Sequence, residues 1–228
     1  ASLWLGQVAR DVAVLLVLFA ALWPVVQWRL GGRLRTASGI AAWGLVTAGF
    51  FIASSRAEAA IRTAVESVSA EERVLDVSLN PGPGDWGCWS AVVMSVDGSR
   101  YRVSTAFVAP FDARRMATCD ARYRGGRTGS DVLTAAAGRT EAPFANTTQV
   151  RWRSSWSAPR ADLAALAKAH CEVDAALHFM RAPVWERVSE RELGLSDARF
   201  GVGAGGFSDV RVPLVSTCGL EGRWVPAW

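Results

Sequence analysis

TASGIAAWGLVTAGFFIASSRAEAAIRTAVESVSA, residues Thr36 to Ala70, joins two kinds of helical sequence without a break. Its first part, Thr36 to Ala53, is free of charge, and as a helix it is about 27 Å long, just enough to cross the hydrocarbon core of a bilayer. Its second part, Ser54 to Ala70, is rich in Ala, Glu and Arg, with high helix propensity for most of its length. The stretch therefore predicts one long helix that leaves the membrane and continues outside it.

A second apolar segment, Val12 to Trp28, precedes this helix and is also free of charge. We predict that the two segments form a transmembrane helical hairpin within residues 1–72. The alternatives are a buried hairpin of a soluble protein and, for the first segment, a signal peptide. A signal peptide is disfavoured because a basic stretch follows in place of a small-residue cleavage site. Residues expected at the membrane interface are Trp23, Trp28, Arg29, Arg33, Arg35 and Trp43.

The connection between the two segments contains three arginines and no acid. The positive-inside rule places this connection in the cytoplasm and both ends of the hairpin outside. The bias is modest, because Arg10, Arg56 and Arg62 lie on the other side. Residues 73–228 are therefore predicted to form an extramembrane domain in the periplasm or its equivalent.

All four cysteines, Cys88, Cys119, Cys171 and Cys218, belong to that domain. This distribution fits an oxidising compartment and up to two disulfides, with three pairings left open. A structural zinc site is disfavoured because no two cysteines have the short C-x2-4-C spacing.

The net charge of +4 is small for 228 residues. It gives no electrostatic reason to expect a nucleic-acid partner. One denser arginine cluster, between Arg114 and Arg127, is interpreted as a solvated loop. The alternative is a patch for anionic lipid head groups or an acidic partner surface.

Strand-like segments dominate the domain. Asp97-Gly98 separates Trp89–Val96 from Arg100–Ala106 and predicts a hairpin, because a type I′ turn needs positive φ at both central positions. The decapeptide NPGPGDWGCW, Asn80 to Trp89, is expected to break the chain before this hairpin. Other strands are expected at Arg73 to Asn80, Gln149 to Trp156, Val184 to Val188, Glu192 to Asp197 and Asp209 to Val215.

One helix is expected inside the domain, from Pro159 to Met180. Its apolar stripe comprises Leu163, Leu166, His170, Val173, Leu177 and Met180. The predicted fold class is α+β: an N-terminal transmembrane helical hairpin, then a mostly antiparallel sheet with this one main helix against it.

Two blocks of the domain resemble a known family. The first runs from Pro81 and Pro83 to Trp89 and continues through Asp97-Gly98 to Tyr101-Arg102-Val103; the second comprises Phe179-Met180-Arg181-Ala182-Pro183 and Ser196-Asp197-Ala198-Arg199-Phe200. Together they resemble the region after the transmembrane helices in the bacterial membrane-bound metal-dependent hydrolase family (LexA-binding, inner-membrane-associated putative hydrolases). There the first block is roughly P-x-P-x-N-P-x-x-W, whereas this chain has Asp85 and Trp86 in place of Asn-Pro.

The resemblance implies a bacterial inner-membrane location and a non-catalytic C-terminal region. The metal ligands proposed for that family are His and Asp residues on membrane helices, and this chain has no histidine before His170. The prolines fix φ and the tryptophans Trp86 and Trp89 supply apolar surface, so the decapeptide is interpreted as domain architecture.

Other candidate sites are weaker. His170 and His178 lie about 12 Å apart along the expected helix, too far for one metal. Asp197 and Arg199 are expected to form a structural ion pair on one strand face. Gly201 to Gly206 lacks the Gly-Lys-Ser/Thr ending of a phosphate loop and is interpreted as a flexible hairpin connection. We therefore assign no catalytic residue, metal or cofactor.

Three functions remain. The favoured one is a non-catalytic accessory subunit in the membrane, whose partners are membrane lipids and other integral membrane proteins of a larger complex, for which an energy-converting complex is one candidate. It is motivated by small residues at Gly44, Ala48 and Gly49 and by 11 tryptophans. The alternatives are the C-terminal part of a metal-dependent hydrolase whose catalytic helices lie upstream, and a periplasmic module that binds lipid or solute.

Overall fold

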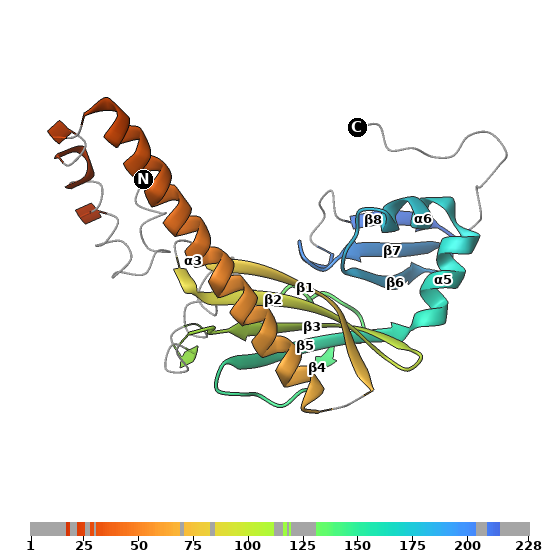
Figure 1. Ribbon diagram of the computed structural model, residues 1–228. Coiled ribbons are helices and arrows are strands. Elements are labelled where there is room, and N and C mark those ends of the chain that lie inside the picture. The colour runs from red at the N-terminus through yellow and green to blue at the C-terminus, as the bar shows by residue number, and fades with distance from the viewer. Residues whose placement is uncertain are drawn as a thin grey trace.

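A long helix, α3 (Gly32–Glu66), leads into an α+β domain in the computed structural model (Figure 1). The helix is continuous across Ala53, so the prediction of one long helix through the apolar segment and the Ala-, Glu- and Arg-rich segment is confirmed. The structure describes residues 17–18, 22–25, 28–29, 31–68, 71–82, 85–111, 116–117, 119, 131–203 and 209–214, with the backbone alone at 85 and 86.

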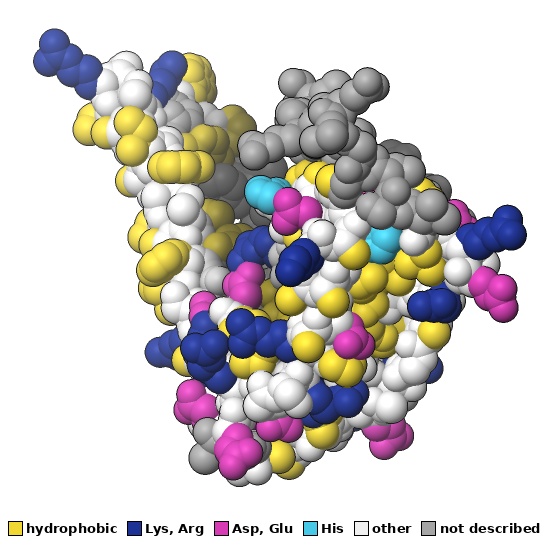
Figure 2. Space-filling view, turned by 90° about the vertical axis from the view of Figure 1, so that its right-hand side faces the viewer, with side chains coloured by type: hydrophobic (Ala, Val, Ile, Leu, Met, Phe, Trp, Pro, Cys, Tyr) yellow, Lys and Arg dark blue, Asp and Glu magenta, His cyan; other side chains and the backbone are white. Residues whose placement is uncertain are grey.

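The two halves of α3 have different surroundings. Before Ala53 most large apolar side chains are exposed, for example Leu45 at 75% and Phe51 at 73%, whereas Phe50 is partly buried. From Ala53 onward one stripe is buried, and it consists of Ala53, Ala57, Ile61, Ala64 and Val65. Figure 2 shows the first half projecting from the molecule with hydrophobic side chains along it. A membrane span is the environment that an exposed apolar helix of this length fits.

Among the described residues, α3 is the one helix with the length and composition of a membrane span, and a signal sequence near the N-terminus passes the same test. Most of the first apolar segment, Val12 to Trp28, lies outside the described residues, so the hairpin stays a prediction. The arginine-bearing connection is shorter than expected. Because α3 begins at Gly32, Arg33 and Arg35 lie in its first turns, and Arg35 Nη2 donates to the Trp28 carbonyl at 3.2 Å.

Five antiparallel strands form the larger sheet, in the order β1-β2-β3-β5-β4. Their bounds are β1 Glu72–Gly82, β2 Asp85–Asp97, β3 Arg100–Val108, β4 Thr140–Glu141 and β5 Val150–Pro159. The buried stripe of α3 packs on one face of this sheet, against Trp89, Val93 and Val108 among others. The expectation of one main helix against the sheet is confirmed only in part: α3 is the main helix and covers this face, whereas the segment from Pro159 to Met180 packs in the core on the opposite face.

Two local expectations about this sheet need correction. The break expected over the whole decapeptide is limited to the connection between the two strands: β1 includes Pro81-Gly82, β2 starts at Asp85, and Pro81 pairs with Trp89. The predicted hairpin of β2 and β3 is present, but its turn is not type I′. Gly98 has φ +54° whereas Ser99 has a negative φ, which is the type II′ pattern.

The expected helix from Pro159 to Met180 is two helices, α5 (Arg160–Ala169) and α6 (Cys171–Leu177). His170 separates them in an extended conformation, with φ −130° and ψ 113°. The apolar stripe runs through both helices, but α5 contacts β5 and α6 contacts β8. One straight helix does not reach both strands, so the chain bends between them.

A second, three-stranded sheet follows, with β6 (Pro183–Ser189), β7 (Glu192–Asp197) and β8 (Asp209–Pro213) in that order. The single sheet expected from the sequence is therefore two sheets. The second packs on the face of the larger sheet opposite α3, through a core that contains Met94, Val103, Trp156, Trp185 and Leu195. The molecule thus has three layers: α3, the larger sheet, and the smaller sheet with α5 and α6.

A disulfide links Cys88 on β2 to Cys119, and both residues are buried in a small core with Phe107, Ala109 and Met116. Cys171 is also a disulfide cysteine, and Cys218 lies outside the described residues. The Cys88–Cys119 pair is thus one of the pairs that the sequence left open. The presence of a disulfide agrees with the predicted oxidising compartment.

Candidate functional site: the polar junction between the sheets

The two segments that carry the second block of the resemblance lie side by side. Pro183 pairs with Asp197 in the β6/β7 ladder, and the Ala198 N–H donates to the Ala182 carbonyl at 2.9 Å. The Arg181 N–H donates to Asp197 Oδ2 at 3.1 Å. Sequence positions about 16 apart are thereby joined at the end of the smaller sheet.

Four charged side chains extend this contact to the larger sheet. We call them the junction cluster: Asp76, Arg181, Asp197 and Arg199. Arg181 binds Asp76 on β1 through Nε at 2.8 Å and Nη2 at 2.5 Å. Arg199 binds Asp197 through Nη2 at 2.6 Å and Nε at 3.0 Å. The predicted pair of Asp197 and Arg199 is present, but Arg199 lies in the turn after β7 and not on the strand.

The surroundings of Asp197 favour its charged form. Burial raises the pKa of Asp197, but hydrogen bonds from the Arg199 side chain and from the N–H groups of Arg199 and Arg181, with the charge of Arg199, lower it more, so the net pKa lies below the ordinary value. The Asp197 hydrogen bond correspondingly raises the pKa of Arg199. Both groups are therefore charged over the whole physiological range.

A buried aromatic group lies beside the cluster. Tyr101 on β3 stacks on Trp185 of β6 with ring centroids 6.0 Å apart, and Trp156 of β5 meets Trp185 edge-on at 4.7 Å. Burial, and then the charges of Asp197 and Asp76, raise the pKa of Tyr101 far above its ordinary value. Tyr101 is therefore a neutral phenol and is not suited to act as a base.

These contacts indicate that the junction cluster connects the two sheets. Each carboxylate of the junction cluster is neutralised by an arginine, and the aromatic group fills the space behind it. In the described ranges, no three His, Cys, Asp or Glu side chains gather as potential metal ligands. His170 is buried between α5 and α6, and His178 ends α6 with its Nδ1 2.8 Å from the Asp174 carbonyl.

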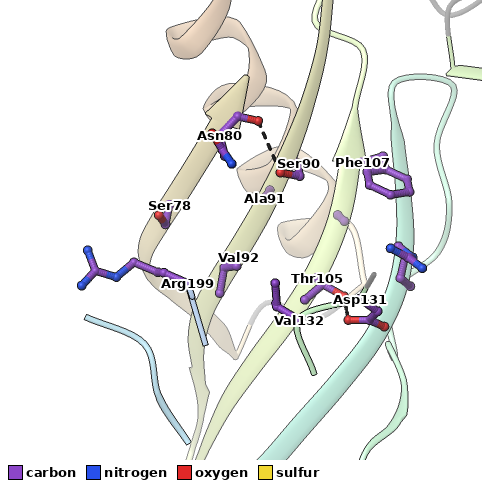
Figure 3. Close-up of a pocket in the computed structure, with 12 residues that line it drawn as sticks. Ser78, Asn80, Ser90, Ala91, Val92, Thr105, Phe107, Asp131, Val132 and Arg199 are labelled. Carbon is purple, nitrogen blue, oxygen red and sulfur yellow. Dashed lines mark hydrogen bonds between the residues drawn. The ribbon is translucent and has the colours of Figure 1, made fainter. Parts of the chain in front are cut away.

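A polar pocket of about 100 Å³ lies next to the junction cluster, on the face of the larger sheet opposite α3 (Figure 3). Thr105 Oγ1 donates to Asp131 Oδ1 at 3.1 Å, and Ser90 Oγ donates to the Asn80 carbonyl at 3.3 Å. The lining side chains that bear hydrogen-bonding groups are Ser78, Asn80, Ser90, Thr105, Asp131, Arg153 and Arg199.

The pocket has the size and polarity for a small hydrogen-bonding solute or a few waters. Sequence reasoning missed it, although Ser78 and Asn80 share one strand face by the period of two. The signal is ambiguous, because alternating polar residues on an edge strand are equally typical of a solvent-facing surface.

The other residues named in the sequence analysis differ in how far they are buried. Trp89 is 4% exposed and meets Phe50 of α3 edge-on, with ring centroids 6.2 Å apart. Pro183 is buried at the start of β6, whereas Phe200 is half exposed under the Arg199 guanidinium. Pro83, the Trp86 side chain and the arginine cluster between Arg114 and Arg127 lie outside the described residues.

No protein-family model, curated protein or solved structure matches the chain. The resemblance to membrane-bound hydrolases therefore stays a prediction, carried by the two blocks alone. The structure itself brings the Arg181 and Arg199 segments of the second block into one cluster.

Replacing Asp197 with asparagine is expected to weaken the acid dependence of stability. Asp197 has a lowered pKa in the folded state and one near 3.9 when unfolded. Its ionised form therefore contributes stability above about pH 4, and that contribution is lost as the pH falls through the lower folded-state pKa. Urea midpoints between pH 7 and pH 2.5 measure it: D197N is less stable at pH 7, and its curve is flatter below pH 4.

Asp162, exposed in the first turn of α5, provides the matched control. D162N is expected to keep the pH profile of the original chain. A D197N profile parallel to the original one down to pH 2.5 would contradict the role given to the Asp197 charge.

Proposed function

We propose that the chain is a non-catalytic accessory subunit that α3 anchors in a membrane and that packs against other integral membrane proteins of a larger complex. The observation that carries this proposal is the continuity of α3. One rigid helix has exposed apolar side chains over the length of a bilayer core and then a buried stripe in the domain core. A domain attached in this way is held at a fixed height and orientation beside the membrane.

The exposed half of α3 offers a surface for partner helices as well as for lipid. Trp43 is 71% exposed, and Gly44, Ala48 and Gly49 are small residues that permit close helix approach. The junction cluster supports a structural role for the domain, because its charges bind one another. Such a domain has the rigidity that an assembly contact requires.

We further propose that the domain faces the periplasm of a bacterial inner membrane. The disulfide Cys88–Cys119 supports an oxidising compartment, and Arg29, Arg33 and Arg35 at the opposite end of the span support a cytoplasmic location for that end. An impermeant thiol reagent applied before and after reduction tests this orientation. Labelling of the reduced cysteines from the cytoplasmic side alone would overturn it.

Purification from native membranes in a mild detergent, with mass spectrometry of the co-purifying proteins, tests the accessory role. The proposal expects membrane-protein partners at a fixed stoichiometry. A chain that purifies alone, continues upstream into helices bearing His and Asp, and hydrolyses a substrate with added metal would overturn it in favour of the hydrolase alternative.

A further inference from the structure

An open groove runs along α3 where the helix emerges from its apolar half. It lies between one side of the helix and two other segments, the loop before β5 and Pro110 after β3, and its volume is about 480 Å³. One cation and several hydroxyl and amide groups line it together with small apolar residues. The lining residues are Arg56, Ala59, Ala60, Thr63, Ala64, Ser67, Pro110, Thr147, Thr148 and Gln149, with no acid among them.

The groove begins at the depth of lipid head groups if α3 spans a bilayer as proposed. Arg56 lies three residues after Ala53, which is about 4.5 Å along the helix axis. The polar layer on each side of the hydrocarbon core is about 5–7 Å thick. Arg56 is therefore placed level with lipid phosphates, and the rest of the groove extends away from the membrane toward Ser67.

Arg56 is held in a position that suits an anion. Its guanidinium carbon lies 5.2 Å from the centroid of the Phe111 ring, and Phe111 is 41% exposed. A guanidinium stacked on a ring keeps its N–H groups free to donate in its own plane, in the geometry that a phosphate accepts. An arginine with an exposed aromatic residue is also a typical pair for the membrane interface.

The loop before β5 adds a preorganised hydroxyl. Thr147 Oγ1 accepts hydrogen bonds from the N–H groups of Gln149 at 3.2 Å and Val150 at 2.9 Å. These bonds use the acceptor lone pairs of the oxygen and leave its O–H as a donor. Gln149 Nε2 donates to the Pro110 carbonyl at 3.2 Å. This hydrogen bond links the loop before β5 to the segment that follows β3.

We propose that this groove binds the phosphate head group of an anionic membrane phospholipid, with Arg56 as the cation and the threonine hydroxyls as further donors. The proposal rests on the membrane attachment proposed above. It adds a specific lipid contact that positions the domain against the bilayer surface. The acyl chains of such a lipid lie along the apolar half of α3, which ends at Ala53, three residues before Arg56.

Arg62 provides a matched control on the same helix. It lies six residues after Arg56, forms an ion pair with Glu58 at 2.8 Å, and is not among the residues that line the groove. Arg56→Gln and Arg62→Gln therefore remove the same charge from the same helix, but only the first removes it from the groove.

The experiment titrates the full chain in a neutral detergent with phosphatidylglycerol or phosphatidylcholine and counts bound lipids by native mass spectrometry. We expect Arg56→Gln to weaken phosphatidylglycerol binding about fivefold, the effect of one arginine at an anionic surface, and Arg62→Gln to leave it within about twofold. Phosphatidylcholine binding is expected to be weak for all three proteins.

Equal losses in both variants, or no preference for phosphatidylglycerol, would overturn the site while leaving the membrane anchor intact. Inorganic phosphate that competes at the same concentration as the lipid would overturn the assignment to a lipid. A chain found outside the membrane fraction would instead overturn the proposed attachment. Urea midpoints equal to that of the original chain verify that each variant is folded.

Discussion

Replacing Trp185 with alanine is expected to lower the free energy of unfolding by about 3–5 kcal/mol. Trp185 is 8% exposed and lies on β6 of the smaller sheet, between Tyr101 and Trp156 of the larger one. Alanine leaves a large cavity in the core that joins the sheets, and its neighbours are fixed by two strand ladders and collapse little. The loss is therefore close to the full cost of truncating a buried aromatic side chain.

Urea unfolding of the full chain in detergent, followed by far-ultraviolet circular dichroism, measures this effect. Val188→Ala on the same strand is the control, since Val188 is 42% exposed, and it is expected to change stability by less than about 0.5 kcal/mol. Trp185→Phe keeps part of the ring contact and is expected to fall between the two. If Trp185→Ala costs no more than Val188→Ala, the two sheets do not share the core described here.

Replacing Glu72 with glutamine is expected to cost about 3 kcal/mol or more. The Glu72 side chain is 3% exposed, forms an ion pair with Arg102, and accepts a hydrogen bond from Ser95 Oγ at 2.5 Å. Arg102, 13% exposed, also lies over the Phe144 ring at 5.7 Å. Glutamine keeps the shape but leaves the arginine charge buried without its counter-charge.

Two further variants distinguish loss of the Glu72–Arg102 ion pair from a general effect of mutation. Asp97 lies 3.9 Å from Arg102 and is 39% exposed, so Asp97→Asn is expected to cost less than about 1 kcal/mol. Adding Arg102→Met to Glu72→Gln removes the uncompensated charge and is expected to recover much of the loss. If the double variant loses as much stability as the single variants Glu72→Gln and Arg102→Met lose together, the result would contradict a buried, coupled pair.

Most strands and the long helix were predictable because their signals are local. Asp97-Gly98 fixes the β2–β3 hairpin, and alternation predicted β7 at Glu192–Asp197 with its observed bounds. The uncharged segment from Thr36 likewise predicted the exposed half of α3. Turn type was less predictable, since the structure puts Gly98-Ser99, and not Asp97-Gly98, at the centre of the turn.

The division into two sheets was not predictable, because pairing depends on contacts between distant segments. No local sequence pattern around Trp185 predicts that it packs on Tyr101 and Trp156. No pattern around His170 predicts that α5 ends there. The buried stripe from Ala53 to Val65 did carry a signal, with apolar residues at helical spacing. The sequence predicts that this segment extends the apolar helix, which the structure confirms, but does not predict that the stripe covers the larger sheet.

The candidate site was predictable only in part. The pair of Asp197 and Arg199 follows from their spacing, and Arg181 stood out through the resemblance. That Arg181 binds Asp76 across 105 positions is a tertiary contact without a local signal. The groove at Arg56 was equally unpredictable from the sequence, because its second wall comes from a distant segment, the loop before β5.

Carbonate extraction of membranes from cells that express the chain, with the intact mass of the extracted protein, tests most directly whether α3 anchors the domain. The account predicts that the chain stays in the membrane pellet with α3 uncleaved, because the exposed apolar half of α3 is continuous with the helix that packs on the sheet. Release of the chain into the soluble fraction, or a product cleaved between the apolar half of α3 and β1, would contradict it.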